Sequence, residues 1–325
     1  MALIQGFQVA ASRYRVLQYL PYMKAQGIDV SVTEFPSSLR GWYILLQNIE
    51  KNTILLVQRK RMSLPVLMLL KRANIKIVYD FDDAIMFKNS LSPNPYSFRR
   101  VLSFKRMLKY SHLVIAGNHF LKKEAEQYHT HVKVLPTPID ATRYTPKTYE
   151  QKDTVNIGWI GDHGSIHYME SYKDVWEALG KKYGARVMLT IICDTFIETR
   201  QIKLNKVYWD FNKEIGDLQM LDIGVMPLFD DLWSWGKCGY KIIQYMGVGL
   251  PAVCTPVGIN RDAVEDGVNG LWASTKKEWI DKISLLIEDS ALREKMGRAG
   301  RKRVMDHYTT QVCAPLLIRW LKEME

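Results

Sequence analysis

The stretch WSWGKCGYKIIQYMGVGLPAVCTPVGIN, residues 233–260, decides how the chain is interpreted. Two glycines, Gly236 and Gly239, precede a helical run at 240–246, and a strand-like segment at 251–255 follows the turn MGVGLP. A helix start framed by glycines offers backbone N–H groups and the positive end of the helix dipole to an anion. The pattern therefore predicts an α/β unit whose helix can receive a phosphate-bearing ligand.

The helical run is expected to have two faces. Ile242, Ile243 and Met246 point to one side and should pack, whereas Lys241 and Gln244 point roughly the opposite way and can bind. Lys237 lies at the entrance to the helix. A solvated Lys/Gln face on a helix that covers a sheet is the competing interpretation.

Outward from this stretch, short apolar runs alternate with helical patterns in both directions. Strands are expected at 3–9, 29–33, 53–58, 75–80, 113–116, 133–136, 155–160, 187–193, 223–227 and 251–255, with helices at 14–26, 63–73, 168–183, 240–246 and 311–325. Such alternation predicts parallel strands with crossover helices. Residues 136–154, PTPIDATRYTPKTYEQKDT, have the composition of a connecting segment.

The fold class expected is α/β, with two doubly wound Rossmann-like domains facing each other across a cleft. We place an N-terminal domain at 1–150, a C-terminal domain at 151–307, and at 308–325 a C-terminal helix that crosses back to the first domain. Ligands of open α/β sheets bind at the carboxyl ends of the strands, so the chemistry is expected between the domains.

Length and composition fit this organisation. The 325 residues suffice for two domains, and 47% hydrophobic with 24% charged residues excludes a disordered polymer. The net charge of +11 favours an anionic partner. The four cysteines form no CxxC pair, which indicates a reducing cytosol, and the longest apolar run is far below the roughly 18 residues of a membrane span. Any membrane contact is therefore expected to be peripheral.

Residues 233–272, which end in PVGINRDAVEDGVNGLW at 256–272, resemble the donor-binding half of GT-B glycosyltransferases of family four, the retaining group 1 enzymes. More loosely, SRYRVLQYLPYMKAQGIDV at 12–30 resembles the opening helix and second strand of that family. In the family, two glutamates eight positions apart bracket the donor. The corresponding positions here are Gly236 and Gln244, so Lys237 and Lys241 would supply charge where the glutamates do not.

The resemblance implies a set of donor-binding residues and a nucleotide diphosphate sugar, UDP-, dTDP- or GDP-linked, as donor, with no cofactor and no metal. Family members place the diphosphate near the loop IGWIGDHGS, 157–165, where glycines let the backbone approach closely. The expected donor-binding residues are Gly161, Asp162, His163, Gly164, Gly239, Tyr240, Gln244 and Asn260. His163 could serve as a base, although a histidine in a glycine loop is more often an exposed hydrogen-bonding residue.

A third pattern, VYDFDDAIMF at 78–87, ends a strand in three carboxylates, Asp80, Asp82 and Asp83. These could bind a divalent ion, but the two-domain pattern points away from a metal-dependent enzyme. We expect Asp82 and Asp83 to face the cleft as catalytic residues, together with Lys237 and Lys241.

Basic residues cluster in the first half of the chain. Arg13, Arg15 and Arg59 are expected to bind the acceptor, and basic residues interleaved with Tyr, Phe and Leu would suit anionic lipid headgroups or a polyprenyl diphosphate. A solvated basic surface explains any one of them equally well.

The function implied is metal-independent transfer of a hexosyl or deoxyhexosyl group, with retention, to a hydroxyl of a glycan or lipid-linked acceptor. A role in cell-surface polysaccharide or glycolipid synthesis at the cytoplasmic face of the membrane would follow. Two alternatives stay open: a nucleotide-sugar epimerase or phosphorylase, and a catalytically silent protein that binds sugars or anions. No pattern of a nucleic-acid-binding motif is present, so nucleic acid is not expected as a partner.

Overall fold

A computed structural model describes residues 1–50, 53–150 and 152–324. The chain forms two compact units, each built from separate pieces of sequence. The first unit consists of Met1–Pro138, Asp231–Cys238 and Thr310–Glu325, and the second of Ile139–Asp230 and Gly239–Thr309. Residues 139–150, which the composition assigns to the N-terminal domain, thus group with the second unit.

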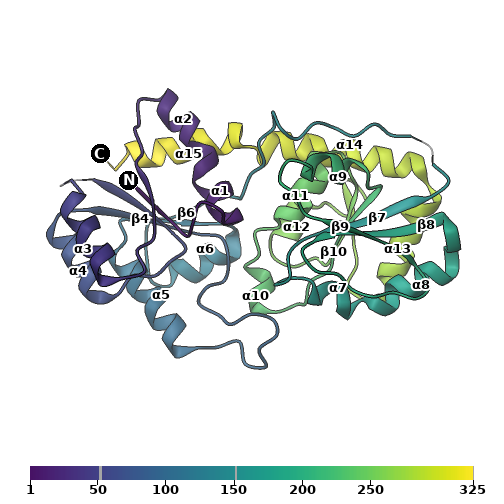
Figure 1. The fold of residues 1–325 in the computed structure, drawn as a ribbon, viewed down its shortest axis with the longest axis horizontal. Helices are drawn as coiled ribbons and strands as arrows, with labels where there is room; N and C mark the ends of the chain where they lie inside the picture. The colour runs from purple at the N-terminus through teal and green to yellow at the C-terminus, as the bar shows by residue number, and fades with distance from the viewer. Residues whose placement is uncertain (51–52, 151, 325) are drawn as a thin grey trace. The chain divides into compact units, whose positions relative to one another are not determined.

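The first unit contains a six-stranded parallel sheet in the order β2-β1-β3-β4-β5-β6 (Figure 1). Its strands are β1 (Ala2–Ile4), β2 (Val32–Glu34), β3 (Ile54–Gln58), β4 (Lys76–Phe81), β5 (Leu113–Ala116) and β6 (Val132–Val134). The chain adds β2 on one side of β1 and then returns to add β3 on the other side. The strand order therefore reverses between β1 and β3, which is the signature of a doubly wound sheet.

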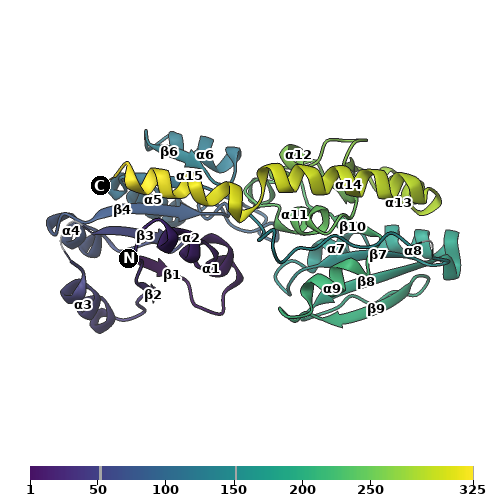
Figure 2. The same ribbon diagram turned by 90° about the horizontal axis from the view of Figure 1, so that it is seen from above.

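Successive residues of these strands are apolar and point to opposite faces of the sheet. Both faces are therefore covered by helices. Tyr79 packs with the helices α3 (Leu39–Asn48), α4 (Leu64–Arg72), α5 (Phe98–Tyr110) and α6 (His119–Glu126). Its neighbour Val78 belongs to the opposite core, with η1 (Leu17–Tyr19), α2 (Leu20–Ala25) and α15 (Thr310–Lys322). Figure 2 shows α15, in yellow, beside α2 over this sheet. α1 (Ala10–Arg15) precedes η1.

The second unit repeats the architecture with a sheet in the order β12-β11-β10-β7-β8-β9, all parallel. Its strands are β7 (Val155–Ile160), β8 (Val187–Cys193), β9 (Lys203–Tyr208), β10 (Ile223–Met226), β11 (Ala252–Cys254) and β12 (Gly270–Trp272). Its helices are α7 (His167–Ser171), α8 (Lys173–Tyr183), η2 (Gly184–Arg186), α9 (Glu214–Gln219), α11 (Tyr240–Gly247), α12 (Ile259–Ala263), α13 (Lys276–Glu288) and α14 (Ser290–His307). The order reverses between β7 and β10.

Glycines inside two central strands let α11 and the segment between α9 and β10 lie very close to the second sheet. A Cβ on Gly224 of β10 would lie 2.4 Å from the ring of Tyr245 on α11, and a Cβ on Gly158 of β7 would lie 2.2 Å from Leu221. Only glycine leaves room for these side chains. The other face of the sheet carries the core of α8 and α13 around Trp176 and Trp279.

The α/β architecture with two doubly wound sheets expected from the sequence is confirmed, and the strands at 113–116, 155–160 and 187–193 coincide with β5, β7 and β8. Several expected elements were wrong in detail. The strand at 3–9 ends at Ile4, the helix at 14–26 is three short helices with Pro21 in the first turn of α2, and the helix at 168–183 is divided at Tyr172. β9, β12, α3, α5, α6, α13 and α14 were not expected.

Two sequence observations have structural counterparts. The four cysteines are free thiols, and Cys193, Cys254 and Cys313 are buried. Within residues 1–50, 53–150 and 152–324, no helix has the length and apolar character needed to cross a bilayer.

Candidate functional sites at the two sheet edges

The carboxyl ends of the strands beside each reversal of strand order are the natural ligand-binding positions of this architecture. In the first unit these are the residues after β1, β3 and β4. In the second unit they are the residues after β7, β8 and β10 and the start of α11. The site residues of each unit are held by contacts within that unit.

Three charged side chains meet at the edge of the first sheet. Arg59 follows β3, and its Nη2 lies 2.6 Å from Oδ2 of Asp83, which follows β4. The other carboxylate oxygen of Asp83 lies 4.0 Å from Nζ of Lys237. Burial lowers the pKa of Arg59, but the negative charges of Asp83 and Asp82 outweigh it and raise that pKa. The structure thus joins Asp83, Arg59 and Lys237 in one cationic cluster around a single carboxylate.

Arg59 also adopts a backbone conformation that favours glycine. Its φ is +58°, and its carbonyl oxygen accepts a 3.0 Å hydrogen bond from the hydroxyl of Tyr79. A non-glycine residue in the left-handed region is energetically unfavourable and is held there by its surroundings. Strain of this kind concentrates at functional positions. In this backbone conformation the guanidinium of Arg59 pairs with Asp83.

Asp82 is the most chemically unusual group of the first unit. It is 5% exposed, and its Oδ1 has no hydrogen-bond partner among the described residues. Burial, reinforced by the neighbouring Asp83, raises the pKa of Asp82 to about 6. A Cβ on Gly117 would lie 2.9 Å from Cα of Asp82, so the glycine after β5 allows this close packing. A carboxyl group with this pKa can exchange a proton near neutral pH.

The segment that carries Lys237 is anchored on the first unit through α10 (Leu232–Trp235). The side-chain amide of Asn118, itself 2% exposed, donates hydrogen bonds to the carbonyls of Trp235 and Lys237 at 3.1 and 3.0 Å. A Cβ on Gly236 would lie 2.4 Å from Cβ of Ala84, which directly follows Asp83. Gly236 therefore serves close packing, and Lys237 is placed by backbone contacts.

One of the residues expected to bind the acceptor, Arg15, does not do so. Arg15 is 1% exposed, and its guanidinium pairs with Asp80 and donates to the carbonyl of Leu135. It is therefore a buried structural residue and not an acceptor contact. Asp80 is engaged in the same pair, which supports the preference for Asp82 and Asp83. Arg13 is half-buried on α1, after the loop that follows β1.

In the second unit, the loop after β7 contains an exposed histidine–aspartate pair. Nδ1 of His163 lies 2.6 Å from Oδ2 of Asp194, the residue that follows β8. The hydrogen bond that His163 donates to the Asp194 carboxylate, together with the charge of that carboxylate, raises the pKa of His163, and the same bond lowers the pKa of Asp194. Asp162 accepts a 2.8 Å hydrogen bond from the hydroxyl of Ser165, which closes the loop around Gly164. His163 therefore keeps its proton to a higher pH than a histidine without this partner.

The same loop is connected to the start of α11 through one indole ring. A Cβ on Gly161 would lie 2.2 Å from the ring of Trp159, and Nζ of Lys241 lies 5.4 Å from the centroid of that ring. Gly239, the residue that caps α11, has a φ of +63° and precedes Tyr240, which is half-buried. The structure therefore brings together the loop glycine and the cation of Lys241 at the edge where a phosphate would meet the helix start.

Gln244 and Asn260 are buried and hydrogen-bonded within the protein. The expectation that they contact the nucleotide-sugar donor is therefore wrong. Gln244 is 3% exposed, and its amide donates a 2.9 Å hydrogen bond to the hydroxyl of Tyr144, which in turn donates to Glu214 at 2.8 Å. α11 is buried continuously from Ile242 to Gly247, so the two-faced helix was wrong at Gln244. Asn260 is fully buried, and its amide donates to the carbonyl of Thr255.

Sequence reasoning missed several partners in these sites, namely Asp194, Trp159, Asn118 and the acceptor Tyr144 of the Gln244 hydrogen bond. Asp194 could have been found, because it is the first residue after the strand expected at 187–193. His163 lies in the loop after the strand expected at 155–160, which is the neighbouring strand of the sheet. Tyr144 could not, since it lies 100 positions from Gln244 in a segment without a secondary-structure pattern.

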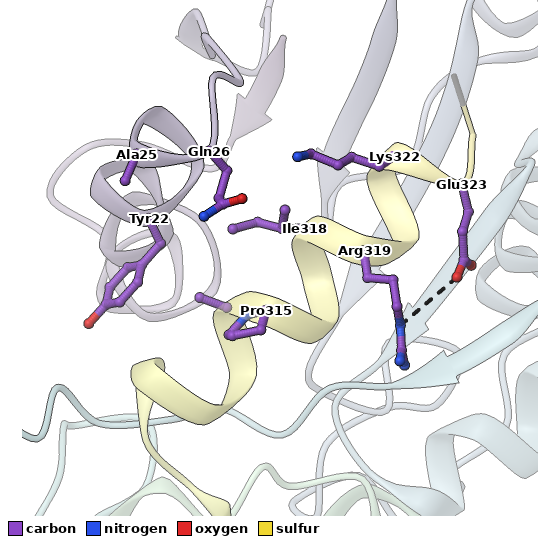
Figure 3. A pocket seen from close by; sticks show the side chains of 9 residues that line it. Tyr22, Ala25, Gln26, Pro315, Ile318, Arg319, Lys322 and Glu323 are labelled. Atoms are coloured by element: carbon purple, nitrogen blue, oxygen red, sulfur yellow. Dashed lines mark ion pairs between the residues drawn. The ribbon is translucent and has the colours of Figure 1, made fainter.

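A cavity of about 640 Å³ lies elsewhere on the first unit, between α2 and α15 (Figure 3). Tyr22, Gln26, Pro315 and Ile318 line it, and Nε of Arg319 lies 3.9 Å from the carboxylate of Glu323 at its rim. None of the expected site residues lines this cavity.

Comparisons with known proteins agree with this geometry. Residues 218–303 match the family model described as glycosyl transferases group 1. HepE from Anabaena, solved in complex with UDP-glucose, is similar at 15% identity, with 99% of this chain and 98% of that chain covered and a TM-score of 0.73. A glycosyltransferase from Rickettsia africae is also 15% identical, with coverage of 99% and 97% and a TM-score of 0.73.

A third similar structure is sucrose-phosphate synthase from Thermosynechococcus elongatus, at 10% identity, with coverage of 99% and 98% and a TM-score of 0.72. No curated protein matches the chain. The comparisons confirm the GT-B fold, with two Rossmann-like domains, and the resemblance to group 1 glycosyl transferases. The matched segment contains α11, Lys241 and Gly239.

Proposed function

We propose that this protein is a glycosyltransferase that moves a sugar from a nucleotide diphosphate donor to a hydroxyl group. The observation that carries the proposal is the edge of the second sheet, where Lys241 lies over Trp159 beside Gly161 and the left-handed Gly239 opens α11. This edge falls at the reversal of strand order, where nucleotides bind in doubly wound folds. The match of residues 218–303 to the group 1 family model supports the same assignment.

The chemistry requires stabilisation of negative charge on the departing diphosphate. Lys241, His163 when it is protonated, and the backbone N–H groups at the start of α11 would bind that charge before and during bond cleavage. Retention of configuration follows from the family resemblance, and a donor phosphate that accepts the acceptor proton would make a dedicated protein base unnecessary. We expect no metal ion to be needed.

In the first unit, Asp82 and Asp83 would bind and orient the acceptor, with Arg59 and Lys237 holding Asp83 in place. A carboxyl group with a pKa of about 6 can accept a hydrogen bond from, or donate one to, a sugar hydroxyl. We further propose a hexosyl or deoxyhexosyl donor and a glycan or lipid-linked acceptor, in surface polysaccharide or glycolipid synthesis at the cytoplasmic side of a membrane.

The decisive experiment is nucleotide binding, measured by thermal shift and by titration calorimetry with UDP, dTDP, GDP and ADP, with and without Mg²⁺. A ligand that binds only the native state raises the melting temperature. We expect one nucleotide to bind without Mg²⁺ and Lys241→Gln to weaken it by roughly tenfold, the equivalent of about 1.4 kcal/mol. Lys295→Gln, which removes an exposed charge elsewhere on the second unit, is the matched control.

Binding of no nucleotide, or equal binding by the Lys241→Gln and Lys295→Gln variants, would refute the assignment of the donor site. Hydrolysis or rearrangement of the nucleotide sugar in the absence of any acceptor would instead favour the epimerase.

A further inference from the structure

Six large apolar side chains are exposed on α4, on α5 and immediately before α5. They are Leu64, Met68, Leu69, Tyr96, Phe98 and Leu102, and their exposed fractions range from 41 to 81%. α4 packs beside α5 on one face of the first sheet (Figure 1). Apolar groups gathered on one surface of a folded protein mark an interaction site, because water contact with them is unfavourable.

The exposed positions of α5 form one stripe. Phe98, Leu102, Lys105 and Lys109 are all exposed, at spacings of four, three and four residues. Such spacing keeps them on one side of an α-helix. The apolar residues occupy the first half of the stripe and the lysines the second half. α4 has the same order, with Leu64 and Met68 before the basic residues of its last turn.

The charge of this surface has a single sign. Its exposed ionisable groups on the two helices are Lys71, Arg72, Arg99, Lys105 and Lys109. No aspartate or glutamate occurs between Glu50 and Asp80 or between Asp83 and Glu124. We call the six apolar side chains and these five cations together the α4–α5 surface.

The positive charge and the exposed apolar side chains of the α4–α5 surface together determine which kind of partner fits it. A second copy of the chain would bring five cations against five others, which is repulsive. A nucleic acid would match the charge but would gain little from an exposed Phe98 and Leu102. An anionic lipid surface matches both, since apolar side chains enter the boundary between headgroups and acyl chains while lysines and arginines contact the headgroups.

We propose that the α4–α5 surface binds a membrane that contains anionic lipids, with Tyr96, Phe98 and Leu102 inserted at the interface. The inference depends only on the surface of the first unit and holds whether or not the protein transfers a sugar. None of the residues that form the surface belongs to the candidate sites at the sheet edges.

The test is cosedimentation of the full chain with vesicles of phosphatidylcholine, with and without 30% phosphatidylglycerol. We expect binding only to the anionic vesicles and a marked loss at high salt, because exposed charges are screened. Lys105→Gln with Lys109→Gln should weaken binding by roughly thirtyfold, since each cation near such a surface contributes about fivefold. Phe98→Ser with Leu102→Ser should weaken it by roughly tenfold or more.

Matched controls remove the same groups from the second unit. Lys181→Gln with Lys295→Gln removes two exposed charges, and Met220→Ser with Leu285→Ser removes two exposed apolar side chains. Both controls should bind like the wild type, and all variants should keep its melting temperature and nucleotide affinity. Equal binding to neutral and anionic vesicles, or equal losses in the α5 and control variants, would overturn the proposal. So would absence of vesicle binding together with a dimer, detected by sedimentation velocity, that Phe98→Ser dissociates.

Discussion

The amide of Gln244 donates a 2.9 Å hydrogen bond to the hydroxyl of Tyr144 inside the second unit. That hydroxyl in turn donates a hydrogen bond to Glu214, which is 1% exposed and also accepts a hydrogen bond from the indole of Trp209. The side chain at position 244 must therefore donate a hydrogen bond to the hydroxyl of Tyr144. A glutamate here, as at the corresponding family position, would face a hydroxyl that already donates to another carboxylate.

Gln244→Glu is therefore expected to lower the free energy of unfolding by about 2–3 kcal/mol, because a buried carboxylate would replace the amide that donates to Tyr144. Thermal and denaturant unfolding at pH 8 measure the change, and Gln47→Glu, at an exposed position of α3, is the control. A Gln244→Glu variant as stable as the control would show that the network does not select glutamine.

Asp82→Asn should change the pH dependence of stability. The native pKa of about 6 exceeds the ordinary value of 3.8. The native state therefore binds more protons than the unfolded state between these values, and stability falls as pH rises through them. The loss is on the order of 3 kcal/mol at most. Unfolding free energies from pH 4 to 7 should fall in the wild type and stay flat in Asp82→Asn, relative to an Asp153→Asn control.

The same variant separates stability from function. If Asp82 orients the acceptor, Asp82→Asn is more stable than the wild type at pH 7 but transfers sugar more slowly. A variant that gains stability and keeps its full transfer rate would contradict the role proposed for Asp82.

Two replacements of Arg59 can distinguish its charge from its backbone strain. Arg59→Ala and Arg59→Gly both remove the ion pair with Asp83, but only glycine relaxes the φ of +58°. We expect the glycine variant to be more stable than the alanine variant by about 1 kcal/mol, and both to lose acceptor turnover to a similar extent. Equal stabilities in chemical unfolding would mean that the backbone of Arg59 is not strained in solution.

His163 should make donor binding depend on pH. Because the hydrogen bond with Asp194 raises its pKa, His163 keeps its positive charge to a higher pH than an unpaired histidine. Affinity for the nucleoside diphosphate should therefore fall as pH rises through that pKa. Asp194→Asn should move the fall to lower pH, whereas Asp174→Asn should not. Calorimetric titrations from pH 6 to 9 measure the midpoint, and an unchanged midpoint in Asp194→Asn would exclude this role.

α15 is expected to be essential for the stability of the first unit. Leu317 is 1% exposed and packs with Trp320 in the core on the face of Val78 and Leu56. Leu317→Ala should lower the unfolding free energy by about 2–5 kcal/mol. Val312→Ala, at a partly exposed position of the same helix, should have a small effect. Equal effects of the two substitutions would show that α15 is not part of that core.

Much of the fold could be predicted from the sequence because its central strands are buried on both faces. β7 and β8 are almost uninterrupted apolar runs, and their bounds were predicted correctly. β9 was missed because it is an edge strand, and none of its residues from Lys203 to Tyr208 is buried. Neither its composition nor its periodicity distinguishes it from a loop.

The candidate sites were predictable only in part. Residues after a strand, such as Asp83 and His163, could be placed at a sheet edge from the order of elements alone. The orientation of Gln244 depended on Tyr144, and the burial of Arg15 on Asp80 and Leu135, which are distant in sequence. A helical wheel assumes one buried face, and α11 has more than one.

The composition of the first unit has a consequence for synthesis of the chain. Thr310–Glu325, which belongs to the first unit, is synthesised after all of the second unit. Until that segment is made, the face of the first sheet that carries Val78 and Leu56 lacks the part of its cover that α15 supplies. The second unit is complete at Thr309, so the half of the protein that is made first is the half that finishes folding last. During that interval the nascent chain displays an apolar sheet face, which makes it a natural client for a chaperone.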